Sequence, residues 1–141
     1  MRIVRRIDPW MPASVAVIAA VSLLAPWARS GRVDRSTIEL LSTAGALDLL
    51  VGWAEVAALV SWYLVPMLAA AAALAAGWHQ ERLTGGFVLP IGPLMGLAWF
   101  AVLRSPLESR WGAGLGVAAG LIATTLAGLL LMRPQNSAEG H

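Results

Sequence analysis

One acidic residue lies close enough to a long apolar stretch to suggest chemistry inside a membrane. Glu55 follows Trp53 and precedes the apolar residues that run to Gly77. A carboxylate held in the hydrocarbon layer could carry a proton, bind a cation or form a buried ion pair. Near the start of a helix, however, the helix dipole and nearby headgroup water stabilise an anion that has no transport role. The sequence favours this second explanation for Glu55, with Asp48 one heptad earlier on the same surface.

Other residues that support catalysis or metal binding are scattered along the chain. His79 stands beside Trp78 in a short polar segment, and the second histidine, His141, is the last residue. Cysteine is absent, which excludes disulfides, thiolate catalysis and cysteine-held metals. We find no nucleophile with an oriented base, no phosphate-binding glycine loop and no paired carboxylates. The sequence therefore predicts a protein that is not an enzyme, holds no metal and needs no cofactor.

Three arginines follow the first apolar stretch and define a candidate contact for lipid headgroups. Arg29, Arg32 and Arg35 carry guanidinium groups that could hold lipid phosphates through paired hydrogen bonds. Ordinary anchoring at the membrane surface is the alternative, and the sequence favours it. The basic residues as a whole are spread over the ends of apolar segments, so they form no surface of the kind that binds nucleic acid.

The composition identifies the solvent in which this chain folds. Of its 141 residues, 58% are hydrophobic and 13% are charged, whereas an ordinary soluble domain has about 25% charged residues. The mean hydropathy is +0.71. One core of a chain this long cannot bury so much apolar surface, but a bilayer can accept it. We therefore expect an all-α integral membrane protein, folded as a single four-helix bundle.

Apolar stretches separated by polar turns predict where the helices cross the membrane. The first stretch has a tryptophan at each end, as expected for an aromatic belt at the two interfaces. The second contains Pro66, and the third begins with Pro90 and Pro93, which would leave its first turn irregular. Residues 78–86 and 104–110 read as polar turns, and 134–141 as a disordered polar tail. The four predicted spans are residues 10–27, 54–77, 87–103 and 111–132.

The polar segment 28–35 leads into a pattern that starts a helix. Ser36 and Glu39 have capping-box spacing, in which the Ser36 hydroxyl accepts from the Glu39 amide and the Glu39 carboxylate reaches back to the Ser36 amide. The helix that begins at residue 37 is too short and too polar to span. We expect it to lie as an amphipathic helix in the membrane surface, between the first and second spans.

Four spans place both termini on one side of the membrane. With these spans, five arginines fall on each side, so their number does not choose an orientation. Three arginines, at positions 2, 5 and 6, precede the first span, which usually dominates the positive-inside rule. The prediction is a multi-pass protein of the inner (plasma) membrane with cytoplasmic termini.

Small residues recur every four positions along the last span. Residues at this spacing form one narrow groove on a helix, where a second helix can approach closely. A shorter pair offers the same surface on the third span. The sequence favours packing within the chain's own bundle over docking of another subunit. We also expect Ser22, Ser61, Thr124 and Thr125 to donate to carbonyls of their own helices. The positions of the groove are Gly112, Gly116, Gly120, Thr124 and Gly128, and those of the pair are Gly92 and Gly96.

A short motif after the first span resembles one found in small actinobacterial membrane proteins. The residues are Pro26-Trp27-Ala28-Arg29-Ser30-Gly31, followed by Arg35-Ser36. Proteins with this arrangement, some called tryptophan-associated membrane proteins, have four spans. The chain is also similar to the accessory subunit of mycobacterial Mce-type lipid importers. The resemblance implies a partner, the permease helices of a lipid transporter, but it assigns no catalytic or ligand-binding residue.

Two functions of different classes follow. The first is a non-catalytic accessory subunit of a larger envelope complex, which packs against permease helices and membrane lipids. The second is a small dimeric proton-coupled transporter that uses Glu55. Small multidrug exporters carry their carboxylate in the middle of the first helix, where this chain has none. The sequence therefore favours the accessory subunit.

Overall fold

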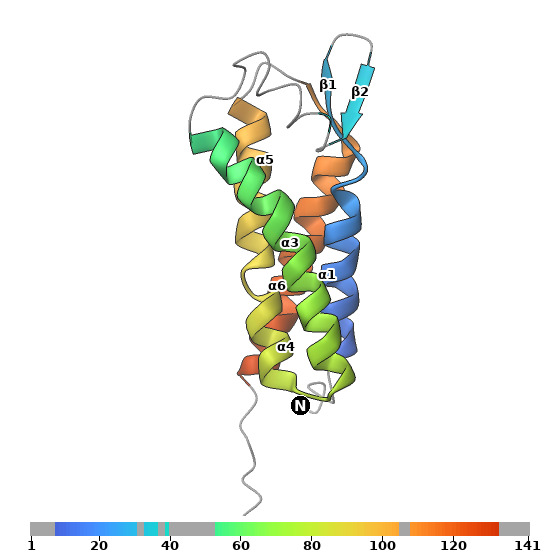
Figure 1. The fold of residues 1–141 in the computed structure, drawn as a ribbon, viewed down its shortest axis with the longest axis vertical. Coiled ribbons are helices and arrows are strands. Elements are labelled where there is room, and N and C mark those ends of the chain that lie inside the picture. The colour runs from blue at the N-terminus through green and yellow to red at the C-terminus, as the bar shows by residue number, and fades with distance from the viewer. Residues whose placement is uncertain (1–7, 31–32, 37–38, 40–52, 105–107, 133–141) are drawn as a thin grey trace, which may run out of the picture.

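Five helices and a small sheet make up the computed structural model. It describes residues 8–30, 33–36, 39, 53–104 and 108–132. In chain order the helices are α1 (Trp10–Ser22), α3 (Trp53–Gly77), α4 (Glu81–Val88), α5 (Ile91–Arg104) and α6 (Trp111–Leu131). The strands are β1 (Pro26–Ser30), β2 (Val33–Ser36) and β3 (Glu108–Ser109). In Figure 1 the helices run lengthwise side by side, and the sheet caps one end.

In the described part of the chain, three helical segments are long and apolar enough to cross a membrane. They are Leu59–Gly77 within α3, Glu81–Leu103 through α4 and α5, and Trp111–Leu131, which is α6. A helix of 20 residues rises about 30 Å, the thickness of a typical hydrocarbon core. The fold is therefore mostly helical and has the character of a membrane protein.

The first apolar stretch differs from its predicted span. Residues 10–27 were expected as one helix, but α1 ends at Ser22 and β1 begins at Pro26. The turn between them is closed by backbone bonds from Leu23, Leu24 and Ala25 to carbonyls three residues earlier. Pro26 has no N–H, so it cannot donate to the Ser22 carbonyl, and the helix stops.

The prediction of an all-α fold with a polar loop at 28–35 was wrong for this end of the chain. β1 pairs with β2 on one side and with β3 on the other, both antiparallel, in the order β2-β1-β3. Between Pro26 and Ala28 the register advances two residues on β1 and one on β2, so Trp27 is the extra residue of a β-bulge.

The third span also begins earlier than predicted, and it is broken. Residues 78–86 were expected to form a turn, but α4 starts at Glu81, so Gly85 and Gly86 lie inside a helix. The chain leaves α4 at Leu89–Pro90 and resumes as α5 at Ile91. Proline at 90 and 93 removes two N–H donors here, which explains the break. By contrast, α3 and α6 cover almost the same residues as the predicted ranges 54–77 and 111–132.

The turn from α3 to α4 is a Schellman motif. The Gln80 N–H donates to the Ala75 carbonyl at 2.9 Å, and the His79 N–H donates to the Ala76 carbonyl at 3.0 Å. His79 has a positive φ of 56°, the left-handed conformation that closes such a motif. This exposed histidine therefore has a local role in ending α3.

Part of the predicted surface helix lies outside the described residues. The Ser36 N–H donates to Glu39 Oε2 at 3.0 Å, which confirms the carboxylate half of the capping box. The rest of the predicted amphipathic helix falls outside the described ranges. The same is true of Asp48, in the segment that follows this helix, and of the predicted tail 134–141.

The core of the bundle is built largely from alanine. Small side chains allow the helices to approach closely, as is usual between membrane helices. The largest fully buried side chains include Trp27, Leu23, Ile91 and Met95. The buried alanines include Ala13, Ala16, Ala69, Ala72, Ala98, Ala113, Ala123 and Ala127.

Candidate functional site

The small-residue face of α6 packs against the rest of the chain. At Gly112, an added Cβ would lie 2.5 Å from the Pro26 carbonyl oxygen and 2.9 Å from Ala25 Cβ. At Gly116, it would collide with Met95 Cε and lie 2.6 Å from Ser22 Oγ. The first two positions of the predicted groove are therefore filled by the end of α1, the start of β1 and α5.

The closest crossing of α5 and α6 lies one turn farther along. An added Cβ at Gly120 would lie 3.3 Å from Gly92 Cα, and one at Gly92 would collide with Thr124 Oγ1. Gly92, of the predicted pair on the third span, thus meets two positions of the α6 groove.

Thr124 makes a polar junction at this crossing. Its hydroxyl donates to the Leu89 carbonyl at 3.0 Å and accepts from the Gly92 N–H at 2.9 Å. In an uninterrupted helix the Leu89 carbonyl would accept from residue 93, which is proline. Thr124 therefore supplies the donor that Pro93 lacks, which is how membrane helices tolerate a break.

Two positions of the predicted set remain open. At Gly96 and Gly128, an added Cβ would meet nothing within 4 Å. The same holds for Gly86 on α4 and Gly114 on α6, which were not in the predicted set. The structure thus separates five filled positions from two that a further helix could approach.

The serine and threonine hydroxyls of the spans fall into two groups, those that donate within their own helix and those that donate to another segment. Ser22 and Thr125 donate to Ala19 and Leu121 of their own helices, as predicted. The prediction was wrong for Thr124, as shown above. It was also wrong for Ser61, whose hydroxyl donates to the Leu94 carbonyl of α5 at 3.1 Å. Ser61 and Thr124 hold α5 from two sides.

Trp27 is the residue that sequence reasoning misplaced most. It was assigned to the aromatic belt, but it is 0% exposed. Its indole Nε1 donates to the Ser22 carbonyl at 2.8 Å, which replaces the donor that Pro26 lacks. The bulge in β1 turns this side chain into the bundle. In the sequence, the only indication that the helix ends here and that Trp27 turns inward was the proline directly before this tryptophan.

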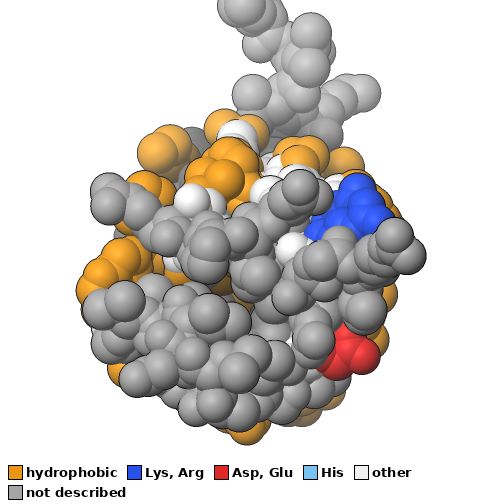
Figure 2. Space-filling view, turned by 90° about the horizontal axis from the view of Figure 1, so that it is seen from above, with side chains coloured by type: hydrophobic (Ala, Val, Ile, Leu, Met, Phe, Trp, Pro, Cys, Tyr) orange, Lys and Arg blue, Asp and Glu red, His pale blue; other side chains and the backbone are white. Residues whose placement is uncertain are grey.

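The arginines of the first loop are in the sheet. Arg29 lies in β1, where it is in register with Asp34 on β2 and Glu108 on β3. The backbone of this residue is thus paired with a strand on each side, so Arg29 has a place in the sheet beside the headgroup hypothesis. Arg35 lies in β2, with its side chain outside the described part, and Arg32 is outside it altogether. Viewed from the sheet end, the described residues show a basic area and an acidic area at the rim (Figure 2).

The structure places the candidate transport residue near the end of the bundle. Glu55 is the third residue of α3 and precedes the apolar segment Leu59–Gly77. Its side chain lies outside the described part. Within the described ranges, no group of three or more histidine or acidic residues is placed to hold a metal ion.

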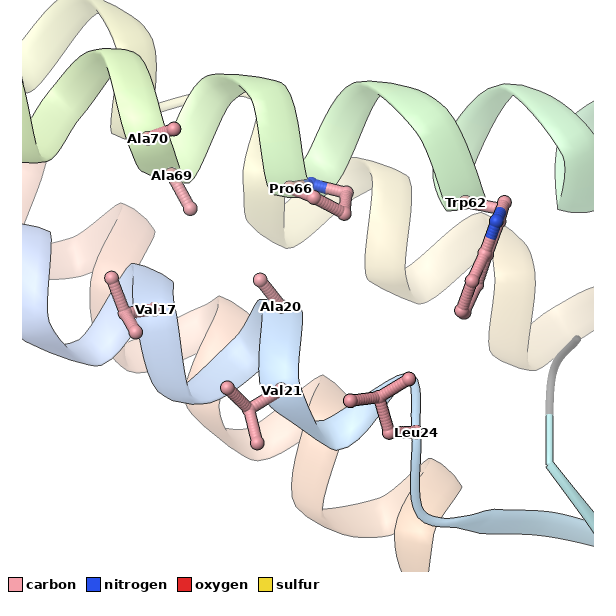
Figure 3. Close-up of a pocket in the computed structure, with 8 residues that line it drawn as sticks. All are labelled: Val17, Ala20, Val21, Leu24, Trp62, Pro66, Ala69 and Ala70. Atoms are coloured by element: carbon pink, nitrogen blue, oxygen red, sulfur yellow. The ribbon is translucent and has the colours of Figure 1, made fainter.

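An apolar groove lies between α1 and α3. It has a volume of about 410 Å³ and is open at the side. Figure 3 shows side chains from the two helices facing each other across it. Its lining is Val17, Ala20, Val21, Leu24, Trp62, Pro66, Ala69 and Ala70. Sequence analysis did not single out this surface, because no residue type in it signals binding.

Comparisons with protein-family models, with curated proteins and with solved structures found no match to this chain. The geometry of the bundle is therefore the basis for assigning a function.

Proposed function

We propose that the protein is a non-catalytic subunit of a larger membrane assembly, held there by helix–helix packing. The observation that carries this proposal is the outer surface of α5 and α6. Gly96 and Gly128 leave open space there, beside large exposed side chains such as Leu97 and Leu129. Small residues next to large ones suit a helix that approaches closely in lipid. Permease helices of an envelope lipid transporter are the partner that the sequence resemblance implies.

The proposal includes four membrane crossings, with the first made by α1 and the segment after it. At one end, Gly77 of α3 lies near Trp10, where an added Cβ would be 3.9 Å from the indole. At the other end, Gly112 of α6 abuts Pro26. The chain from Trp10 to Pro26 thus runs from the Gly77 end of α3 to the start of α6. Its irregular part is covered at Leu23 and Trp27, which are buried, while Leu24 is exposed. The N–H groups of Leu23, Leu24 and Ala25 are paired with carbonyls of α1, which irregular backbone at that depth requires.

Single cysteines will test this topology, since the chain has none of its own. We expect Asp8→Cys and Gln80→Cys to be protected from a membrane-impermeant maleimide in intact spheroplasts of the inner membrane. Ser36→Cys should be labelled, because the sheet lies at the opposite end of the bundle (Figure 1). Permeabilised cells provide the control, in which all three should react. Equal labelling of Asp8→Cys and Ser36→Cys in intact cells would show that α1 does not cross.

Partner association will test the function itself. The tagged chain should bring a stoichiometric set of membrane subunits from its native membrane in mild detergent. We expect Gly96→Leu or Gly128→Leu to reduce that recovery at least tenfold, because leucine fills the open space. Gly86→Leu is the matched control, since it is equally open but lies outside the repeat. Mass spectrometry of the eluate measures the result.

Two outcomes would contradict the proposal. If both leucine variants retain the partners, the face on α5 and α6 is not the interface. If the wild-type chain emerges alone or only with itself, the accessory role is wrong. The small-transporter hypothesis then gains support, and a transport assay of Glu55→Gln becomes the decisive experiment.

A further inference from the structure

An exposed aromatic pair marks the sheet end of α3 and α5. Trp53, the first residue of α3, stacks on Phe100 near the end of α5, and their ring centroids are 6.1 Å apart. Trp53 is 53% exposed and Phe100 is 42% exposed. Large aromatic side chains are usually well buried, but in this alanine-rich bundle the pair faces outward.

Two further tryptophans lie at the same level. Trp99 precedes Phe100 on α5 and lies seven residues beyond Gly92, while Trp111 begins α6, nine residues before Gly120. Gly92 and Gly120 meet where the two helices cross. At 1.5 Å per residue, Trp99 and Trp111 lie about 10 and about 14 Å from that crossing, both toward the sheet. Both are exposed, so three helices present aromatic rings within one turn of the same level.

The opposite end of the bundle carries a second pair of exposed tryptophans. Trp78 follows the end of α3, and Trp10 begins α1. An added Cβ at Gly77 would lie 3.9 Å from the Trp10 indole, so the two tryptophans share a level by direct contact with the same turn. Trp78 is 25 residues from Trp53, a length of helix that rises about 37 Å. This distance lies between the hydrocarbon core of about 30 Å and the whole bilayer of about 40–45 Å.

The charged residues of the helices agree with these two levels. Each lies within about one helical turn of an aromatic level or outside it, and the long interval between the levels carries no charge. A hydrocarbon layer requires such an interval, because a charged side chain is costly at its centre. The charged residues of the described helices are Glu55, Glu81, Arg82 and Arg104.

We infer that these aromatic side chains form two belts that bind lipid at the two membrane–water interfaces. Indole rings favour that layer because the ring is apolar while its N–H can donate to headgroups and water. The inference uses the three apolar segments that are long enough to cross, and it depends neither on a crossing by α1 nor on a partner subunit. The first belt is Trp53, Trp99, Phe100 and Trp111, and the second is Trp10 and Trp78.

The belts place the sheet outside the hydrocarbon layer. Ala28 of β1 is in register with Ser109 of β3, which precedes α6. The sheet from Ala28 onward therefore lies beyond Trp111 and the first belt, at the end of the bundle shown in Figure 1. Its charged residues then lie among headgroups and water, where they need not be desolvated.

Nitroxide depth measurements along α3 will test the position of the belts. Single cysteines replace exposed residues of α3, are spin-labelled and are reconstituted in dioleoylphosphatidylcholine vesicles. We expect the ratio of collisions with oxygen to collisions with a water-soluble nickel chelate to peak at Leu64→Cys or Met67→Cys, which flank the midpoint between the belts. A peak at one of the other positions, or a flat profile, would overturn the inference. The five positions are Val56, Val60, Leu64, Met67 and Leu74.

Tryptophan quenching will test the contact with lipid directly. Vesicles with bromine on the acyl chains near the headgroup are compared with vesicles brominated near the chain ends. The emission lost in Trp111→Phe or Trp78→Phe should be emission that the shallow bromines quench more strongly. Trp62→Phe is the matched control, because Trp62 is half-buried and lies nine residues from Trp53, about 14 Å deeper. The emission that it removes should be quenched more strongly by the deep bromines.

Circular dichroism will confirm that each phenylalanine variant keeps the wild-type fold. The same quenching depth for Trp111 and Trp62 would overturn the inference. Emission from Trp111 and Trp78 that neither lipid quenches would also overturn it, because protein, such as a second copy of the chain, would then cover the belts. These results are independent of the partner face on α5 and α6, which the recovery of membrane subunits tests separately.

Discussion

Gly116→Ala is expected to destabilise the folded bundle by about 1–3 kcal/mol, the usual cost of overpacking a filled interior. The new Cβ would lie 2.6 Å from Ser22 Oγ and 2.9 Å from Trp27 Cζ2, and it would collide with Met95 Cε. The methionine can move, but Trp27 is fully buried and is held by its hydrogen bond to Ser22. Alanine favours a helix over glycine by up to about 1 kcal/mol, which offsets only part of the cost.

The same helix supplies the control. At Gly114 an added Cβ meets nothing within 4 Å, so Gly114→Ala should keep or slightly raise stability. Gly112→Ala should resemble Gly116→Ala, because its nearest atom, the Pro26 oxygen, belongs to backbone. Thermal unfolding in detergent, followed by circular dichroism, measures the three variants. Equal midpoints for Gly114→Ala and Gly116→Ala would mean that α6 does not pack through this face.

The helical part of this fold was accessible from the sequence because membrane helices leave a simple signal. Long apolar stretches flanked by polar turns predicted α3 and α6 almost to the residue. The repeat of small residues on α6 likewise predicted a face for close packing. The spacing of the small residues and the composition do not show which neighbouring segment packs against each small residue. Gly116 and Gly128 belong to the same repeat, yet one is enclosed and the other is open.

The sheet end could not be predicted, because its strands are short and polar. β1 and β2 have five and four residues, and β3 has two. Their pairing joins segments that lie far apart in the sequence, since Arg29 meets Glu108 in register. A strand of this kind leaves no apolar alternation. The bulge that buries Trp27 depends on that pairing, so the role of Trp27 was hidden as well.

The broken third span shows a different limit. Pro90 and Pro93 correctly indicated an irregular start, but α4 extends the helical path back to Glu81. Its polar residues had suggested a loop. Thr84 is buried and donates to the Gln80 carbonyl one turn earlier, which satisfies its hydroxyl inside the helix. The polar residues of α4 therefore suggested a turn, although tertiary packing and side-chain hydrogen bonds stabilise a helix there.

Thr124→Val is expected to cost about 1–3 kcal/mol, although valine has nearly the shape of threonine. The substitution removes the donor to Leu89 and the acceptor for Gly92 together. Both backbone groups lie at the break between α4 and α5, where Pro93 offers no replacement. In hydrocarbon an unpaired backbone group finds no water, so the loss is not compensated locally. Measured hydrogen bonds between membrane helices average about 0.6 kcal/mol, but here two bonds are lost at once.

Its neighbour Thr125 provides the matched control. The Thr125 hydroxyl donates only to Leu121 of its own helix, and that carbonyl belongs to an unbroken turn. Thr125→Val should therefore leave the unfolding midpoint almost unchanged, and Thr124→Ser should restore most of the loss by returning the hydroxyl. Hydrogen exchange should show the Gly92 amide losing protection in Thr124→Val but not in Thr125→Val. If that amide stays protected, another group pairs it, and Thr124 is not what holds the two halves of the broken helix together.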